Sequence, residues 1–140
     1  MIKASLILPA FLAAVLIAAP VAAQVGPTAA PGRGTAQRTA ILNALRPSIE
    51  AELRGPVEFR INCLQVNNGW ALVNADPQRP GGRAINPNIL PDPEFRDGLT
   101  VTAVMRYRNG RWNLVERAIG ATDVWYEQLA PQALQRSRCY

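Results

Sequence analysis

The chain has 140 residues, a formal net charge of +5, no histidine and a single lysine, Lys3. The absence of histidine excludes imidazole-based catalytic triads and imidazole metal sites. Because every other basic residue is arginine, a Schiff-base lysine and a phosphate-loop lysine are excluded beyond Lys3.

Residues 1–23 carry the pattern of a secretory signal peptide. Lys3 supplies the basic start, an apolar run spans residues 4–19, and Val21, Ala22 and Ala23 form a small-residue cleavage site. The run is short for a membrane anchor, and Pro20 follows it. We expect cleavage and a soluble periplasmic or secreted protein with no stable membrane span, an uncleaved anchor being the alternative.

The remainder is predicted to form a flexible linker over residues 24–37 and a single domain over residues 38–140. The linker is rich in glycine, proline and alanine and has nothing to bury. Cys63 and Cys139 lack metal-site spacing, so in an oxidising compartment they predict one disulfide, with two unpaired thiols as the alternative.

A helix is predicted from Thr35 or Thr39 to Arg54. Apolar residues recur there at helical spacing, namely Ile41, Leu42, Leu45, Ile49 and Leu53. Gly55 and Pro56 form a stop signal. Pro47 inside the pattern predicts a kink or two short helices.

Residues 57–75 are predicted to form a first hairpin. The loop is interpreted as three residues, 67–69, with Gly69 in the left-handed conformation, which sets Val66 opposite Trp70 and Leu64 opposite Leu72. A bulge near residues 62–63 is needed to bring all the apolar positions to one face, namely Val57, Phe59, Ile61, Leu64 and Val66.

Residues 76–98 form a long loop rich in proline and glycine. Such a loop is either functional or mobile, or else a surface crossover with Ile85, Ile89, Leu90 and Phe95 tucked onto the body.

Residues 99–119 are predicted to form a second hairpin around Asn109-Gly110, a dipeptide typical of two-residue loops. Because side chains alternate between faces, this loop sets the pairing of the whole hairpin. One face then carries the pairs Tyr107–Trp112, Met105–Leu114, Ala103–Glu116 and Val101–Ala118. The other carries Arg108–Arg111, Arg106–Asn113, Val104–Val115 and Thr102–Arg117.

A short helix over residues 124–130 is predicted to follow, with Thr122 or Asp123 as its cap and Pro131 as its end. We expect Trp125 and Leu129 to close one edge of the core, and the polar tail to fray unless Cys139 is paired.

The predicted register makes Glu116 the one carboxylate on the apolar face of the second hairpin. It is the weak catalytic candidate, as an acid, base or ligand anchor beside Trp112 and Tyr107. The structural alternative is an ion pair with Arg46 or Arg54, or an edge position facing water.

Binding candidates are the Trp70/Trp112 region with Tyr107, and an arginine strip of Arg106, Arg108, Arg111 and Arg117. Guanidinium groups suit phosphate and carboxylate, although alternating arginines also serve solubility. Asp92, Glu94 and Asp97 lack the spacing of an EF-hand, so a solvated loop is favoured over calcium binding. No cofactor or metal is predicted.

A helix followed by two hairpins resembles the cystatin-like fold and the cone-shaped fold of nuclear transport factor two-like proteins. Residues 65–69, QVNNG, resemble the Gln-x-Val-x-Gly hairpin tip of cystatins, but Asn67 replaces the central valine and no Pro-Trp marks the second tip. The segments RTAILNALRP, GWALVNADPQRPGGR and RWNLVERAIGATDVW are similar to a family of uncharacterised exported proteobacterial proteins, which implies export and one intact domain.

The expected fold is α+β: an N-terminal helix packed on a curved four-stranded antiparallel sheet, with a short C-terminal helix. A small Src-homology-3-like barrel is the alternative if the first helix stands apart. The expected function is a non-enzymatic exported binding or interaction module. Candidate partners are an anionic envelope component or another periplasmic protein, and nucleic acid is not expected. The alternative is a small enzyme or ligand-binder that uses Glu116 in a helix–sheet cavity.

Overall fold

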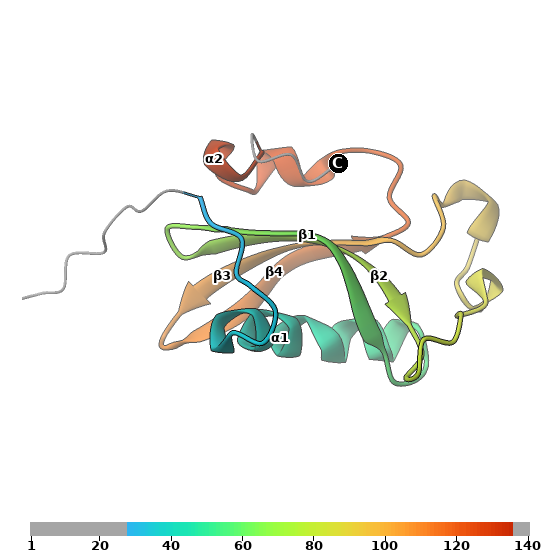
Figure 1. Ribbon diagram of the computed structural model, residues 1–140. Helices are drawn as coiled ribbons and strands as arrows, with labels where there is room; N and C mark the ends of the chain where they lie inside the picture. Colours follow the sequence, from blue (N-terminus) through green and yellow to red (C-terminus); the bar gives the residue numbers. More distant parts are fainter. Residues whose placement is uncertain (1–27, 136–140) are drawn as a thin grey trace, which may run out of the picture.

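The computed structural model describes residues 28–135 and has an α+β fold. Four antiparallel strands form one sheet in the order β1-β2-β3-β4. Helix α1 covers one face of the sheet, called the helix face below, and the C-terminal segment covers the other, called the outer face (Figure 1). The predicted fold class is confirmed. Because α1 packs against the sheet, the condition for the barrel alternative is not met.

Helix α1 spans Ala36–Glu52 and follows its N-cap Thr35, whose hydroxyl accepts a hydrogen bond from the Arg38 amide at 3.3 Å. The buried stripe is the predicted one, and Ile41, Leu45, Ile49 and Leu53 have no exposed surface. Each such side chain contributes roughly 1.5–3 kcal/mol on burial. Pro47 lies on the exposed side of one continuous helix, so the two-helix alternative is wrong.

The first hairpin joins β1 (Glu58–Asn67) to β2 (Trp70–Gln78). Its loop is the two residues Asn68 and Gly69, with φ of 46° and 72°, so the predicted three-residue loop is wrong. Asn67 therefore opposes Trp70. The predicted bulge is confirmed, since the register shifts between Ile61 and Cys63 and all five apolar positions pack toward α1.

The second hairpin joins β3 (Val101–Arg108) to β4 (Arg111–Ile119). Near the turn the prediction is confirmed, because Tyr107 opposes Trp112 and Met105 opposes Leu114. Beyond Leu114 the strand carries an unpredicted bulge. The pairs there are Val104–Glu116, Ala103–Arg117, Thr102–Ala118 and Val101–Ile119. One extra residue reverses the faces, so the predicted pairs of Val101 to Val104 are wrong.

The long connection between β2 and β3 contains two single-turn 3-10 helices, η1 (Pro87–Ile89) and η2 (Pro93–Phe95). Ile85 and Leu90 are buried and Ile89 packs against the core, as the crossover interpretation predicted. Phe95 does not pack on the body, since this residue is 77% exposed.

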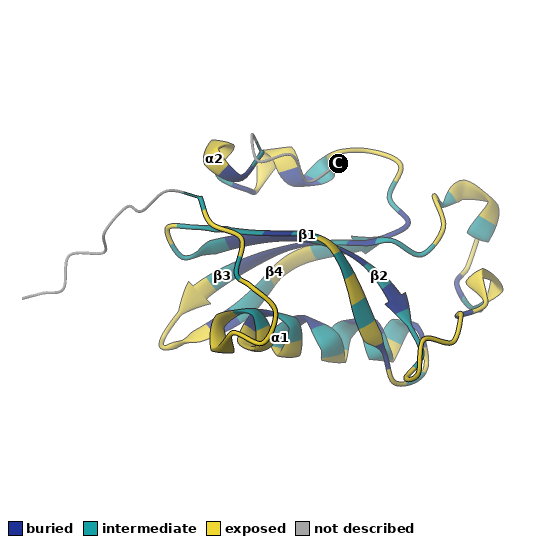
Figure 2. Cartoon of the chain, viewed as in Figure 1, coloured by how far each residue is buried: buried dark blue, intermediate teal, exposed yellow. Residues whose placement is uncertain are grey.

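The C-terminal segment differs from the single predicted helix. It forms a 3-10 turn, η3 (Trp125–Gln128), and then helix α2 (Gln132–Gln135) beyond Pro131, with no side-chain cap on η3. Leu129 is 41% exposed, so its predicted core role is wrong. Tyr126, Ala130 and Leu134 are buried instead, and they cover Leu72 and Val104 on the outer face of the sheet (Figure 2).

The described part of the predicted linker is attached to the sheet. Ala29 forms an antiparallel bridge with Val66 through hydrogen bonds of 2.9 and 2.7 Å. The predicted signal peptide, residues 1–23, lies outside the described residues. Among residues 28–135 no helix is long and apolar enough to cross a membrane.

Candidate functional site

A groove of about 790 Å³ lies between the first half of α1 and the tips of both hairpins. Its lining residues come from these three elements, and they are Gln37, Ala40, Asn43, Ala44, Val66, Gly69, Tyr107, Gly110, Arg111 and Trp112. Such a volume falls within the usual range for small-molecule pockets. Ala40 and Ala44 sit beside the buried stripe of α1, and these short side chains leave room between the helix and the hairpin tips.

Tyr107 and Trp112 form the aromatic wall of this groove. They are direct cross-strand partners, with ring centroids 5.4 Å apart and planes inclined at 60°. Trp112 is 8% exposed and joins the core, whereas Tyr107 is 47% exposed. The wall therefore has one fixed ring and one accessible ring, which suits stacking against a flat ligand.

The polar groups of the groove are few and differ in kind. Arg111 is the one charged residue of the lining, and its guanidinium makes no hydrogen bond or ion pair within residues 28–135. Gln37 adds an amide, and the Asn43 side-chain oxygen is occupied by Arg46. The described lining holds no carboxylate, thiol or serine hydroxyl. The Arg111 guanidinium and the Gln37 amide can orient a hydrogen-bond acceptor or an anion in a ligand. Among the described lining residues, the Tyr107 hydroxyl is the one group that could transfer a proton.

Trp70 does not join this groove, which corrects the single Trp70/Trp112 region that the sequence suggested. The two-residue first turn places Trp70 on the outer face, where it packs against the cluster of Leu72 and Val104. The guanidinium of Arg106 lies 4.7 Å from the Trp70 ring centroid and donates a hydrogen bond to the Asn68 carbonyl at 2.8 Å.

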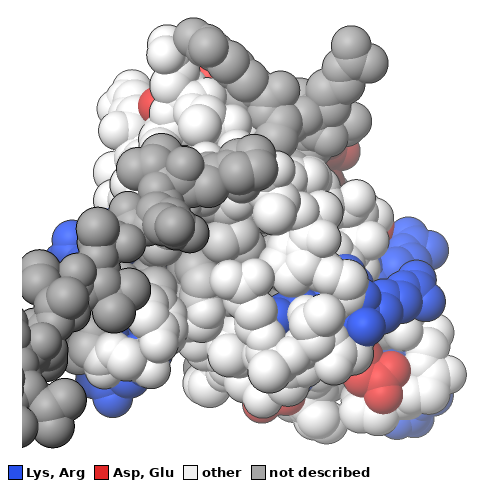
Figure 3. Space-filling model, turned by 60° about the vertical axis from the view of Figure 1, so that its left-hand side comes forward, with Lys and Arg blue, Asp and Glu red and all other residues white. Residues whose placement is uncertain are grey.

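The predicted arginine strip is not formed as one surface. Arg106 is engaged with Trp70, Arg108 and Arg111 stand exposed at the hairpin tip, and Arg117 points to the opposite face. A group of basic side chains does stand together at the right-hand edge of the face shown in Figure 3.

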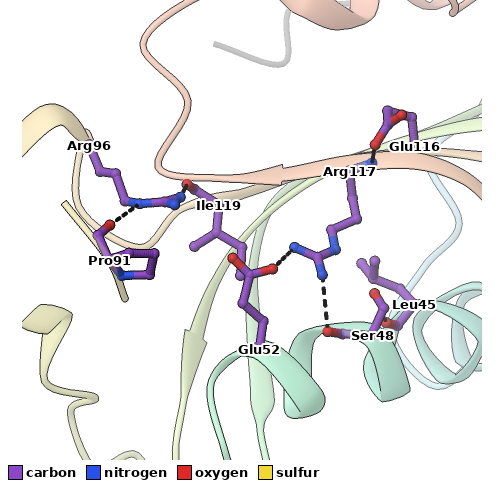
Figure 4. A network of polar contacts seen from close by, with 8 residues as sticks. All are labelled: Leu45, Ser48, Glu52, Pro91, Arg96, Glu116, Arg117 and Ile119. Carbon is purple, nitrogen blue, oxygen red and sulfur yellow. Dashed lines mark hydrogen bonds and ion pairs between the residues drawn. The ribbon is translucent and has the colours of Figure 1, made fainter. Parts of the chain in front are cut away.

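Arg117 takes the place that Glu116 was expected to occupy on the helix face. Its guanidinium pairs with Glu52 and donates a hydrogen bond to the Ser48 carbonyl at 3.2 Å, both on α1 (Figure 4). Glu116 is exposed, and its carboxylate accepts a hydrogen bond from the Arg117 amide at 3.2 Å. The prediction that Glu116 lies on the apolar face is wrong, because the bulge turns it outward.

Glu116 borders a separate hollow of about 430 Å³ on the outer face, together with Trp125 and Leu129. No ion pair between Glu116 and Arg46 or Arg54 is found in the described region. Glu116 is exposed instead, as the alternative of a position facing water predicted. The acidic loop residues Asp92, Glu94 and Asp97 also form no metal cluster. Residues 28–135 contain no group of three or more His, Cys, Asp or Glu side chains placed to hold a metal ion.

Sequence reasoning found Tyr107, Trp112 and Arg111 but missed the helix side of the groove. Gln37, Ala40 and Ala44 share one side of α1, since they recur at spacings of three and four residues. That spacing is visible in the sequence. What it could not show is that this side faces the hairpin tips.

No family model, curated protein or solved structure was found to match this chain. The resemblance to exported proteobacterial proteins, and to cystatin-like and nuclear transport factor two-like folds, stays a prediction.

Proposed function

We propose that this protein is a non-enzymatic exported binding module whose groove takes a small ligand with a flat apolar body and an anionic group. This proposal rests on which residues line the groove. Tyr107 and Trp112 form an aromatic wall, Arg111 supplies the one charge, and no carboxylate opposes it among the described lining residues.

Binding is favoured over catalysis by the same composition. General acid–base or nucleophilic catalysis needs a group whose pKa or nucleophilicity suits the reaction. The enzyme alternative relied on Glu116 inside a helix–sheet cavity, and that carboxylate is exposed on the outer face. A ligand of about 20 non-hydrogen atoms, at roughly 0.3 kcal/mol per atom, would bind with a Kd on the order of tens of micromolar.

Export by cleavage after residue 23 and a Cys63–Cys139 disulfide belong to this proposal. Both the signal peptide and Cys139 lie outside the described residues. Cys63 supports the bridge by its position, because it packs in the outer-face cluster with Leu134 of α2. Gln135, the last described residue, precedes Cys139 by four positions. The ligand would then be an anionic component of the cell envelope or of the medium.

The test uses 2-naphthalenesulfonate, a flat apolar anion, titrated into the exported protein and followed by NMR chemical shifts and calorimetry. Arg111→Gln and Tyr107→Ser should each weaken binding about fivefold to tenfold, which corresponds to about 1–1.4 kcal/mol. Arg108→Gln removes the same charge from the residue paired with Arg111 across the two-residue turn, and it should change the Kd less than twofold. Equal Kd values for all three variants would overturn the proposal, as would the absence of shifts at Trp112.

A further inference from the structure

A second groove, of about 420 Å³, runs between β1 and the start of α1. Its lining is basic and apolar, and comprises Arg33, Gly34, Arg38, Thr39, Leu42, Phe59, Arg60, Ile61 and Gln78. We propose that this groove binds a phosphate group, of the monoester or diphosphate type. The site is separate from the aromatic groove and does not depend on the function proposed above.

Three arginine residues line this groove from three different segments, although the Arg60 guanidinium is turned toward Asp76. Arg33 precedes α1, Arg38 lies in its first turn, and Arg60 projects from β1. No carboxylate is among the described lining residues. Like charges held close together repel each other unless a counter-charge is present. The planar guanidinium group also matches the spacing of the oxygens of phosphate, to which it can donate two hydrogen bonds. The groove is therefore suited to a multiply charged oxyanion.

The arginines differ in how far their charge is already balanced. Arg60 pairs with Asp76 at 2.9 Å. Burial raises the pKa of Asp76, but hydrogen bonds from Arg60, Thr100 and Asn62 outweigh it and hold that pKa below its ordinary value, so the pair stays ionised at neutral pH. Arg33 and Arg38 have no carboxylate partner within residues 28–135, and the Arg38 guanidinium donates a hydrogen bond to the Pro31 carbonyl at 3.5 Å. These two guanidinium groups carry the unbalanced charge.

The rest of the groove indicates what the phosphate is attached to. One side of the groove is apolar and is formed by Leu42, Phe59 and Ile61. Inorganic phosphate would make no apolar contact with this side. The phosphate is therefore expected on an organic carrier with some apolar surface. A soluble phosphate ester and a phospholipid headgroup share this chemistry, and the experiment separates them.

The first measurement is calorimetric titration of the exported protein with pyrophosphate and with phenyl phosphate at 50 mM salt. We expect both to bind, phenyl phosphate being favoured by the apolar side. Arg33→Gln and Arg38→Gln should each weaken binding at least threefold and the double variant at least tenfold. Raising the salt to 200 mM should weaken binding further, because the attraction is electrostatic. Arg33 is exposed and Arg38 is half-buried, and neither has an ion pair within the described residues. The thermal midpoint should therefore shift little, and this shift serves as the folding control.

Arg108→Gln is the matched control, since it removes one positive charge from a residue that does not line this groove. Vesicles of phosphatidylcholine with and without phosphatidic acid form the second arm. Loss of vesicle binding in the Arg33/Arg38 double variant assigns the site to a lipid headgroup, whereas phenyl phosphate binding without vesicle binding assigns it to a soluble ester. The proposal is overturned if neither phosphate compound nor vesicles bind, or if Arg108→Gln weakens binding as much as Arg38→Gln. Variants at Arg111 and Tyr107 should leave phosphate binding unchanged, so the two proposals can fail separately.

Discussion

The ion pair between Arg117 and Glu52 ties β4 to the last turn of α1. A carboxylate near the C-terminal end of a helix is disfavoured by the helix dipole, and the guanidinium of Arg117 offsets this. Both side chains are partly buried, at 22% and 29% exposure, and Arg117 also satisfies the Ser48 carbonyl. The neighbouring Glu116 has a single local contact and faces water.

Replacing Arg117 should therefore cost more stability than replacing Glu116. We expect Arg117→Gln to lower the free energy of unfolding by about 1–2 kcal/mol, because it leaves Glu52 and a helix carbonyl without their partner. Glu116→Gln should change it by less than about 0.5 kcal/mol, as is usual for exposed positions. Urea denaturation of both variants measures the difference. Combining Arg117→Gln with Glu52→Gln should cost less than the sum of the single changes; strict additivity would contradict the pairing.

At the scale of elements, the backbone at the end of β4 crosses close to the loop before β3, and Gly120 lies at this crossing. This residue has φ of 65°, its amide donates a hydrogen bond to the Thr100 carbonyl at 2.8 Å, and its carbonyl accepts one from the Asp97 amide at 2.9 Å. A Cβ at Gly120 would lie 2.4 Å from the Gly98 carbonyl oxygen and 2.9 Å from the Arg96 Cβ. The crossing therefore requires glycine for both conformation and space.

Gly120→Ala is expected to destabilise the protein by about 3 kcal/mol or more, since the backbone of the long loop must move. Gly81→Ala is the matched control: its φ is 81°, but nothing lies within 4 Å of the added Cβ. That substitution should cost only about 1 kcal/mol, the price of a left-handed alanine. Chemical denaturation of the two variants distinguishes space from conformation, and equal losses would show that the crossing is not tightly packed.

The order of elements was predictable at this scale because its signals are local. The stripe from Ile41 to Leu53, the Asn109-Gly110 turn and the bulge near Asn62 could all be deduced from spacing, and all are present. The bulge after Leu114 could not be deduced, because the residues of β4 alternate acceptably with or without it. Whether the bulge forms depends on how the side chains of β4 pack against α1 on one face of the sheet and against η3 on the other.

At the scale of the whole molecule, the sheet is covered on both sides. The larger core lies between the sheet and α1, and the smaller one joins Leu72 and Val104 to Tyr126, Ala130 and Leu134. Cys63 is part of the smaller cluster. A bridge to Cys139 would hold the C-terminal segment against β1 and close this second layer.

We expect the intact mass of the purified protein to rise by about two hydrogens on reduction, as one disulfide requires. Reductant should also lower the free energy of unfolding by about 2–4 kcal/mol, because the closed loop is long. Cys139→Ser should reproduce that loss without any further effect of reductant. An unchanged mass after reduction would exclude the bridge.

The candidate site shows the same division between local and long-range information. Tyr107, Trp112 and Arg111 could be placed together from one turn, whereas the split between Trp70 and Trp112 followed from a loop one residue shorter than predicted. A change of one residue moves a side chain to the other face of a sheet, so a site that draws on two hairpins is sensitive to every turn and bulge between them.

By itself the sequence determined the helix, the two hairpins, one bulge and the turn that pairs Tyr107 with Trp112. These follow from periodicity and turn chemistry within a few residues of each other. Only the tertiary structure decided that Arg117 reaches α1 while Glu116 faces water, that the C-terminal segment covers the outer face, and that small residues of α1 leave a groove. The physical reason is that each face of a strand is buried by elements that lie far away in the chain. Which face is buried therefore selects the strand register, and the residues of the strand alone do not.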